Sequence, residues 1–214
     1  MRPYHFMPEL IFQGLHSSTA TLAVMSDATF RAIAEMHDWP YTDKYAMKHL
    51  GGTLIQMKEK FVEFSTLGIS KMVEDFFNDL ERFGNIKLSI WSSLCDSVGF
   101  SKEVRLIRHL GNVIKHNNSM LESSTGGKST EGLIAVYGFR DDTPIHWLDV
   151  FKSPERDSIL KYIYMAYQFC IEVLRFKGLL PGEGHVIKEE EIVPHMLRCF
   201  VHTIPGHPAY GTEG

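Results

Sequence analysis

A column of polar and basic side chains follows one face of the segment 101–116, which we predict to be helical. With about 100° between consecutive residues, the side chains of Arg108, Asn112 and His116 fall within a sector of about 80°. The opposite side of the predicted helix is apolar and is expected to pack against the protein. Three further basic residues share or border the polar sector, and these are Arg105, His109 and Lys115.

This column contains the groups that phosphodiester chemistry requires. Arginine presents a planar set of N–H donors that matches phosphate oxygens, and histidine exchanges a proton near neutral pH. We therefore predict Arg108, Asn112 and His116 as catalytic residues for attack of an RNA 2′-hydroxyl on the adjacent phosphate without a metal. The predicted RNA- or phosphate-binding residues are Arg105, His109 and Lys115. The alternative is an ordinary solvated face, since basic residues near a helix C-terminus are favoured by the helix dipole.

The residues 110–117, Leu-Gly-Asn-Val-Ile-Lys-His-Asn, resemble the signature helix of the HEPN superfamily (higher eukaryote and prokaryote nucleotide-binding domains). Ribonucleases of that family carry an arginine, often followed by asparagine, and then a histidine late in a helix of an all-α bundle. The resemblance implies a homodimer or pseudo-dimer whose facing motif helices form one composite site for metal-independent RNA cleavage. It also implies a place in toxin–antitoxin or antiphage defence. In this chain, His116 matches the catalytic histidine and Asn112 the polar residue before it.

Gly111 stands where the commonest form of that motif has its arginine. Arg108 lies one helical turn earlier, about 5.4 Å along the axis, on the same face as His116. Two functions therefore stay open. The first is an RNA-cleaving or RNA-binding protein, an endoribonuclease if active, that has RNA as its partner. The second is a catalytically degenerate interaction subunit, an antitoxin or defence-complex component, that forms a homodimer or hetero-complex through the motif helix. A HEPN-like acceptor of a nucleotidyl group is a third alternative.

Two other motifs receive a structural interpretation. The residues 126–130, Gly-Gly-Lys-Ser-Thr, match half of a phosphate-binding P-loop, but Glu122 stands where the full pattern needs glycine. We therefore predict a flexible loop there. The histidines of the C-terminal segment lack the spacing of a zinc site, so neither a metal nor a cofactor is expected. These histidines are His185, His195, His202 and His207.

The composition is that of a globular protein, with 44% hydrophobic and 22% charged residues among 214. A net charge of −4 excludes a protein that holds nucleic acid by overall positive charge. Cys95, Cys170 and Cys199 are too widely spaced to predict a disulfide framework, so buried thiols in a reducing compartment are expected. No run approaches about 18 apolar residues, so we expect no membrane partner and a cytoplasmic location.

Hydrophobic periodicity and helix-end signals predict an all-α fold, an antiparallel helical bundle of HEPN-like order with a small β-strand or hairpin insertion. The bundle is assigned to residues 26–178 and the insertion to about 119–150, between an irregular segment 1–25 and a C-terminal extension 179–214. The predicted helices cover 26–37, 43–67, 70–83, 86–98, 101–116, 153–177 and 196–201. The helix 153–177 is apolar around much of its circumference, so it is expected to lie centrally. The predicted strands cover 133–137 and 145–148.

Overall fold

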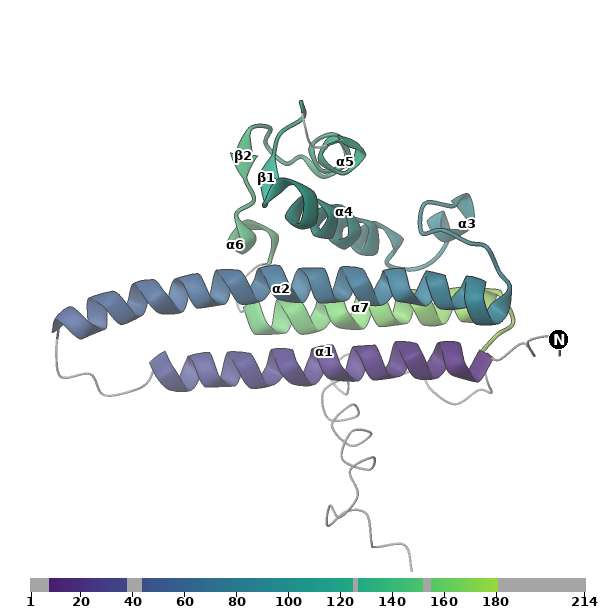
Figure 1. Cartoon of the computed structure of the whole chain (residues 1–214), viewed down its shortest axis with the longest axis horizontal. Helices are drawn as coiled ribbons and strands as arrows, with labels where there is room; N and C mark the ends of the chain where they lie inside the picture. The colour runs from purple at the N-terminus through teal and green to yellow at the C-terminus, as the bar shows by residue number, and fades with distance from the viewer. Residues whose placement is uncertain (1–7, 38–43, 125–126, 152–154, 181–214) are drawn as a thin grey trace, which may run out of the picture. The chain divides into compact units, whose positions relative to one another are not determined.

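The computed structural model describes residues 8–37, 44–124, 127–151 and 155–180. Over these residues the regular structure is helical except for one antiparallel pair of short strands, which confirms the predicted all-α class with a small strand insertion (Figure 1). None of the described helices has the length and apolar character needed to cross a membrane. The elements are α1 (Pro8–His37), α2 (Lys44–Gly84), α3 (Ser93–Asp96), α4 (Ser101–Asn117), β1 (Met120–Leu121), α5 (Gly127–Tyr137), β2 (Thr143–Pro144), α6 (Trp147–Val150) and α7 (Glu155–Phe176).

Helix α1 corrects the prediction of an irregular segment 1–25 for the described part of that segment, residues 8–25. It begins at Pro8, and proline is well tolerated in the first turn because its missing N–H has no partner there. Ile11, Leu15 and Thr19 follow at four-residue steps and are all buried. Gly14, which lies in the segment predicted to be irregular, marks a close approach, since a Cβ there would lie 3.2 Å from Asp79 Oδ2. The glycine therefore serves packing and does not end the helix.

Helix α2 runs without interruption where two helices were predicted. Ser70 was expected to begin a second helix, but it is fully buried within α2, and Ile69, Met72 and Val73 are buried beside it. Continuous burial of one stripe overrides the local preference of serine for a helix start. The predicted end at Gly84 is confirmed, and Asn85 follows in the left-handed conformation with φ of 49°.

The described residues separate into two compact units, and several helices contribute to both. The first unit comprises 8–24, 71–105 and 160–180. Its core contains fully buried aromatic side chains of α2 and α7, with the rings of Phe77 and Phe169 6.3 Å apart. The buried side chains of α7 include Ile163, Tyr167 and Leu174, so this helix is central in its unit, as its composition predicted. The predicted end of this helix before Gly178 is confirmed, because Gly178 adopts the left-handed conformation with φ of 66°.

The segment 86–98 of this unit was predicted to be a helix, and this prediction is wrong. The chain is non-helical up to the short helix α3, whose first turn is capped by the Ser92 hydroxyl accepting from the Leu94 N–H. Ile90 is buried, but the neighbouring Trp91 is 47% exposed. Contacts with Arg105, described below, hold the segment in this form.

The second unit comprises 25–37, 44–70, 106–124, 127–151 and 155–159. It contains the predicted insertion, but the strands are β1 and β2, with Met120 opposite Pro144 and Leu121 opposite Thr143. The residues 133–137, predicted as a strand, form the end of helix α5. Thr130 and Leu133, three residues apart, are its buried positions, which fits a helix and not a strand. The second predicted strand, 145–148, is replaced by the start of α6.

Some predictions fall outside the described residues: the helix 196–201, the extension 181–214 with its four histidines and Cys199, and the start at Ser153 of the last helix. Cys95 and Cys170 are free and buried, as expected. Burial raises the pKa of both thiols, and it raises that of Cys170 well above its ordinary value. Within the part of the chain that the structure covers, no group of three or more metal-ligating side chains is assembled.

Candidate functional site

Helix α4 carries the predicted column and has the predicted bounds to within one residue. Its apolar side is buried as expected, through Val104, Ile107, Leu110 and Val113. The helix ends at Asn117, after which Asn118 adopts the left-handed conformation with φ of 49°. The structure also shows what the opposite, polar side of α4 contacts, and this decides how its side chains can act.

Arg108 reaches helix α2. Its Nη1 donates to the backbone carbonyl of Ser70 at 2.9 Å and contacts the Ser70 hydroxyl at 3.0 Å. Both residues belong to the second unit. A guanidinium that donates to a partly buried carbonyl contributes to stability, because hydrogen bonds to charged groups are among the stronger ones in proteins. Arg108 therefore fastens α4 to α2, a role that the sequence pattern did not indicate.

Gly111 lies at a close approach of α4 to α2. A Cβ on this residue would be 2.4 Å from the Ser70 hydroxyl oxygen and 2.6 Å from the Ser70 Cβ. Both distances are shorter than carbon and oxygen atoms accept without a shift of the backbone. An arginine at this position, as in the commonest form of the HEPN motif, has no room in this packing. The crossing of the two helices therefore leaves no space for a side chain at position 111.

Asn112 and Asn117 both contact helix α5. The Asn112 side-chain amide donates to the Ser129 hydroxyl at 3.0 Å, and the Asn117 amide donates to the Thr130 hydroxyl at 3.3 Å. Ser129 and Thr130 belong to the Gly-Lys-Ser-Thr sequence that was predicted as a flexible loop. From Gly127 onward this sequence instead forms the first turn of α5. Its hydroxyls are therefore used to bind α4.

His109 also packs against α5. A Cβ on Gly132 would lie 2.7 Å from two ring atoms of His109, so the absence of a side chain there admits the imidazole. The ring meets that of Tyr137 edge-on, with centroids 6.2 Å apart and an interplanar angle of 66°. His109 is half-buried in this contact. Its surroundings are those of a residue that joins two helices.

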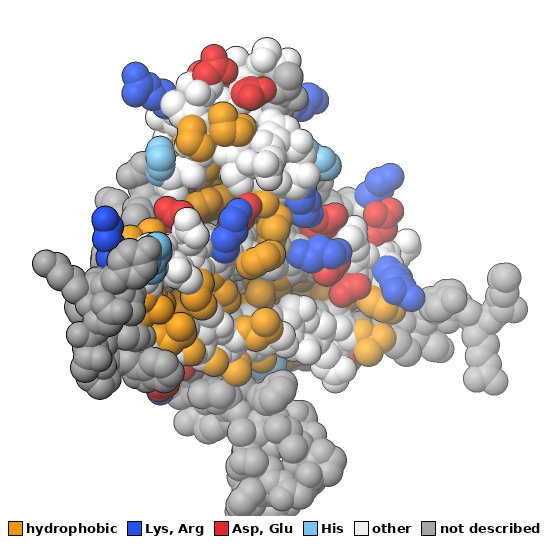
Figure 2. Space-filling model, turned by 60° about the vertical axis from the view of Figure 1, so that its left-hand side comes forward, with side chains coloured by type: hydrophobic (Ala, Val, Ile, Leu, Met, Phe, Trp, Pro, Cys, Tyr) orange, Lys and Arg blue, Asp and Glu red, His pale blue; other side chains and the backbone are white. Residues whose placement is uncertain are grey.

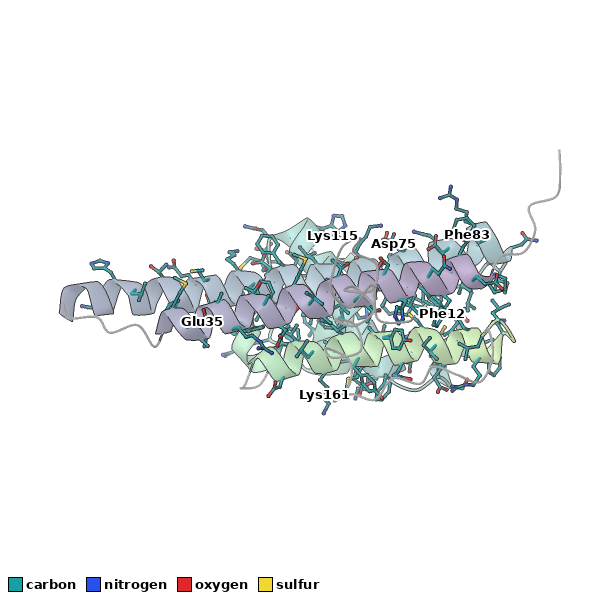
Figure 3. All side chains as sticks on the ribbon, turned by 90° about the horizontal axis from the view of Figure 1, so that it is seen from below. Phe12, Glu35, Asp75, Phe83, Lys115 and Lys161 are labelled. Atoms are coloured by element: carbon teal, nitrogen blue, oxygen red, sulfur yellow. The ribbon has the colours of Figure 1, made fainter. Side chains whose placement is uncertain are left out.

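Lys115 and His116 differ from the rest of the column because both are exposed, in the last turn of α4. Figure 3 labels Lys115, whose side chain extends outward from the ribbon. These two residues remain accessible to a phosphate or to a partner protein. Their position at the helix C-terminus is also the one that the helix dipole favours for basic groups.

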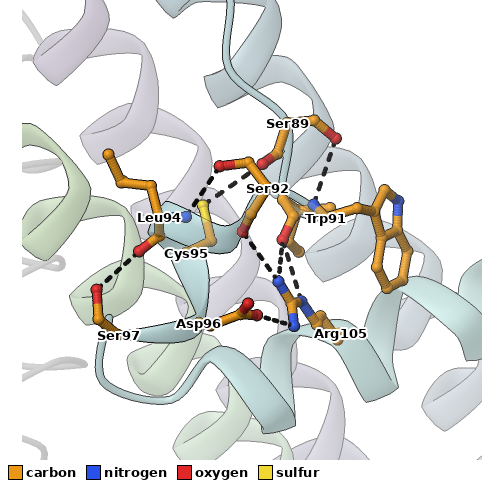
Figure 4. Close-up of polar contacts among 9 residues, drawn as sticks. Ser89, Trp91, Ser92, Leu94, Cys95, Asp96, Ser97 and Arg105 are labelled. Carbon is orange, nitrogen blue, oxygen red and sulfur yellow. Dashed lines mark hydrogen bonds and ion pairs between the residues drawn. The ribbon is translucent and has the colours of Figure 1, made fainter.

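Arg105 belongs to the first unit, where it holds the segment 86–98 (Figure 4). Its Nε and Nη2 donate to the Ile90 carbonyl at 3.0 and 2.8 Å, and Nη2 also donates to the Ser92 carbonyl at 3.3 Å. Nη1 pairs with the Asp96 carboxylate at 2.5 Å, and the guanidinium lies 5.8 Å from the centre of the Trp91 ring. The guanidinium is thereby engaged on several sides within its own unit.

The predicted column is therefore divided among four roles, of which the first is the binding of the segment 86–98 by Arg105. Arg108 binds α2, His109 and Asn112 bind α5, and only the two exposed residues at the end of the helix face solvent. Ser70, the partner of both Arg108 and Gly111, was missed by the sequence analysis. The signal that could have found it is the glycine inside an otherwise regular amphipathic helix, which often marks close approach of another backbone.

Comparison of the chain with models of protein families, with curated proteins and with solved structures finds no match.

Proposed function

We propose that this chain is a HEPN-like interaction protein whose motif helix is a structural element rather than a ribonuclease site. The observation that carries this proposal is the crossing at Gly111 and Ser70. There the position of the usual arginine is filled by a helix contact, and Arg108 donates to Ser70. Asn112 is likewise engaged with Ser129.

Metal-independent RNA cleavage requires a cation and a proton-transfer group that converge on one phosphate. A phosphate bound by Arg108 would have to compete with the Ser70 carbonyl and hydroxyl, and the buried carbonyl would then lose its second donor. His116 supplies a proton-transfer group, but the exposed cation beside it, Lys115, lies about 100° away around the helix, so the two side chains do not face one point. This arrangement favours a role in assembly over a role in bond cleavage.

An interaction protein needs a surface for its partner, and helix α2 offers one. Met57 and Phe64 are 41% and 66% exposed, lie seven residues apart on one side of the helix, and have the half-buried Phe61 between them. Figure 2 shows hydrophobic side chains exposed among charged ones on the face that it presents. We propose a second copy of the chain as the partner. Antiparallel pairing of two α2 helices sets Met57 of each copy opposite Phe64 of the other, as a twofold interface requires.

Sedimentation velocity over a range of concentrations tests the assembly role. The wild type should form dimers, and Phe64→Glu should shift it to monomers because a carboxylate would be buried in the interface. Val136→Glu is the matched control, since Val136 is 63% exposed but lies on α5. A wild type that stays monomeric at all concentrations, or equal dimerisation of Phe64→Glu, would contradict the proposed partner.

The second candidate, RNA cleavage or binding, is favoured by the exposure of Lys115 and His116. Incubation of the purified protein with total RNA and EDTA, followed by mapping of 2′,3′-cyclic phosphate ends, separates the two functions. We expect no new ends. If the wild type cleaves RNA and His116→Ala does not, with unchanged circular dichroism, the protein is a ribonuclease and the proposed assembly role is contradicted.

A further inference from the structure

A cavity of about 470 Å³ lies in the second unit, beside the strand pair and the end of α5. This volume falls in the range of small-molecule binding sites. Its wall combines apolar and aromatic groups with two basic side chains, and no residue of the predicted polar column belongs to it. The residues that line it are Leu121, Tyr137, Gly138, Phe139, Arg140, Thr143, Pro144 and His146.

The aromatic wall is set by the way α5 ends. Gly138 has φ of 72°, its N–H donates to the Ile134 carbonyl at 3.2 Å, and the Phe139 N–H donates to the Leu133 carbonyl at 3.1 Å. The Gly138 bond, to the carbonyl four residues earlier, is the left-handed cap that ends α5, and with the Phe139 bond this cap turns the chain. It brings Tyr137 and Phe139 to the same cavity from the two sides of a glycine.

The opposite wall is fixed by the strand pair and its turn. The Ile145 N–H donates to the Ser119 carbonyl at 2.9 Å, and the Asp142 N–H donates to the Leu121 carbonyl at 2.6 Å. At the turn itself, Asp141 accepts from the Ser123 N–H at 2.9 Å and from its hydroxyl at 2.6 Å. These bonds hold both ends of the turn in place. The cavity is therefore preformed and does not depend on a ligand to create it.

The basic groups differ in environment from the aromatic ones. Arg140 and His146 are exposed, whereas Leu121 is buried and Tyr137 and Phe139 are half-buried. A guanidinium beside an aromatic wall can bind an anionic group that a ring carries, because the ring packs on the wall while the anion meets the planar N–H donors. A neutral apolar ligand would leave the Arg140 guanidinium unused, and a cation would be repelled by it.

We propose that this cavity binds a small ligand that consists of a planar aromatic ring bearing a phosphate or a carboxylate. The ring lies against Tyr137, Phe139 and Pro144, and the anion is bound by Arg140 and His146. The site is independent of the assembly role proposed above, since it uses no residue of the α2 stripe or of the α4 column.

Ligand-observed NMR and calorimetry on the full chain test this site with four probes: phenyl phosphate, benzoate, phenol and inorganic phosphate. We expect binding of phenyl phosphate or benzoate at about 1 mM or better, and weaker binding of phenol and of inorganic phosphate, which each lack one half of the ligand. The comparison of phenyl phosphate with benzoate identifies which anion the site prefers. Failure of all four probes to bind, or equal binding of phenol and phenyl phosphate, would overturn the proposal.

Two variants locate the binding. Arg140→Gln should weaken phenyl phosphate about tenfold and leave phenol unchanged, because only the anion loses a charged donor. Phe139→Ala should weaken both. Lys128→Gln is the matched control, as an exposed basic residue of α5 that does not line the cavity. Because Arg140 is exposed, its variant is expected to fold, and an unchanged unfolding temperature verifies this. An equal loss in Lys128→Gln would show nonspecific charge binding and refute the site.

Discussion

The crossing of α4 over α2 makes a sharp prediction about Gly111. Replacing a helical glycine by alanine ordinarily stabilises a helix by about 1 kcal/mol. At Gly111 the new Cβ would lie 2.4 Å from the Ser70 hydroxyl oxygen and 2.6 Å from its Cβ, so the helices must move apart. Overpacking of this kind costs about 1–3 kcal/mol, and the Arg108 bonds to Ser70 weaken as well. We expect Gly111→Ala to lower the stability by about 2 kcal/mol net.

Thermal and urea unfolding measure this change, and about 2 kcal/mol corresponds to a drop in Tm of about 4–8 °C for a chain of this size. Gly52→Ala is the matched control, because Gly52 is also within a helix but has nothing within 4 Å of the place that a Cβ would take. It should stabilise by about 1 kcal/mol. The pair of glycine variants therefore differs in sign for a purely steric reason.

Variants of Ser70 test whether the contact with this residue causes the loss of stability in Gly111→Ala. Ser70→Gly removes both atoms that the new methyl group would meet, so in this background Gly111→Ala should become stabilising by about 1 kcal/mol. Ser70→Ala keeps the Cβ and should rescue only in part. The reasoning would be refuted if Gly111→Ala raised the stability of the wild type, or if its effect were the same in all three backgrounds.

Three further predictions concern other described residues. Arg105→Lys should lower hydrogen-exchange protection of 86–98 at least tenfold, because lysine cannot replace the forked donors, whereas unchanged protection would refute the clamp. Hydrogen bonds from Ser123 lower the pKa of Asp141, so this stabilisation exists above the ordinary aspartate pKa and is lost as pH falls through the lowered one. Ser123→Ala should raise that pKa in a carboxyl NMR titration. Cys170 should react with iodoacetamide only in denaturant, as peptide mapping would show, because burial raises its pKa.

The elements that could be predicted from the sequence are those whose end signals agree with their hydrophobic period. Helix α4 and the stops at Gly84 and Gly178 belong to this group. The errors arose where a local signal was overridden by packing. The segment 1–25 was predicted to be irregular, yet the buried stripe of α1 runs through its described part, and Ser70 suggested a helix start inside a continuous α2.

The candidate site shows more clearly that a local sequence pattern does not reveal tertiary contacts. Periodicity placed Arg105, Arg108, Asn112 and His116 on one side of a helix, and the helix was confirmed. Periodicity cannot say which residues of another element stand opposite that side. Here Ser70 and Ser129, which are distant in sequence from their partners, occupy the space that a substrate would need. Polar residues on an amphipathic helix can therefore bind a neighbouring helix as readily as solvent.

The contact between Tyr137 and His109 gives the protein an internal probe. Tyr137 lines the cavity and its ring also meets the His109 imidazole. The circulating π electrons of an aromatic ring shift the resonances of nearby protons, so any change in the tilt of Tyr137 should be recorded by the imidazole protons of His109. Occupation of the cavity can thus be followed at a residue of α4 without attaching a label.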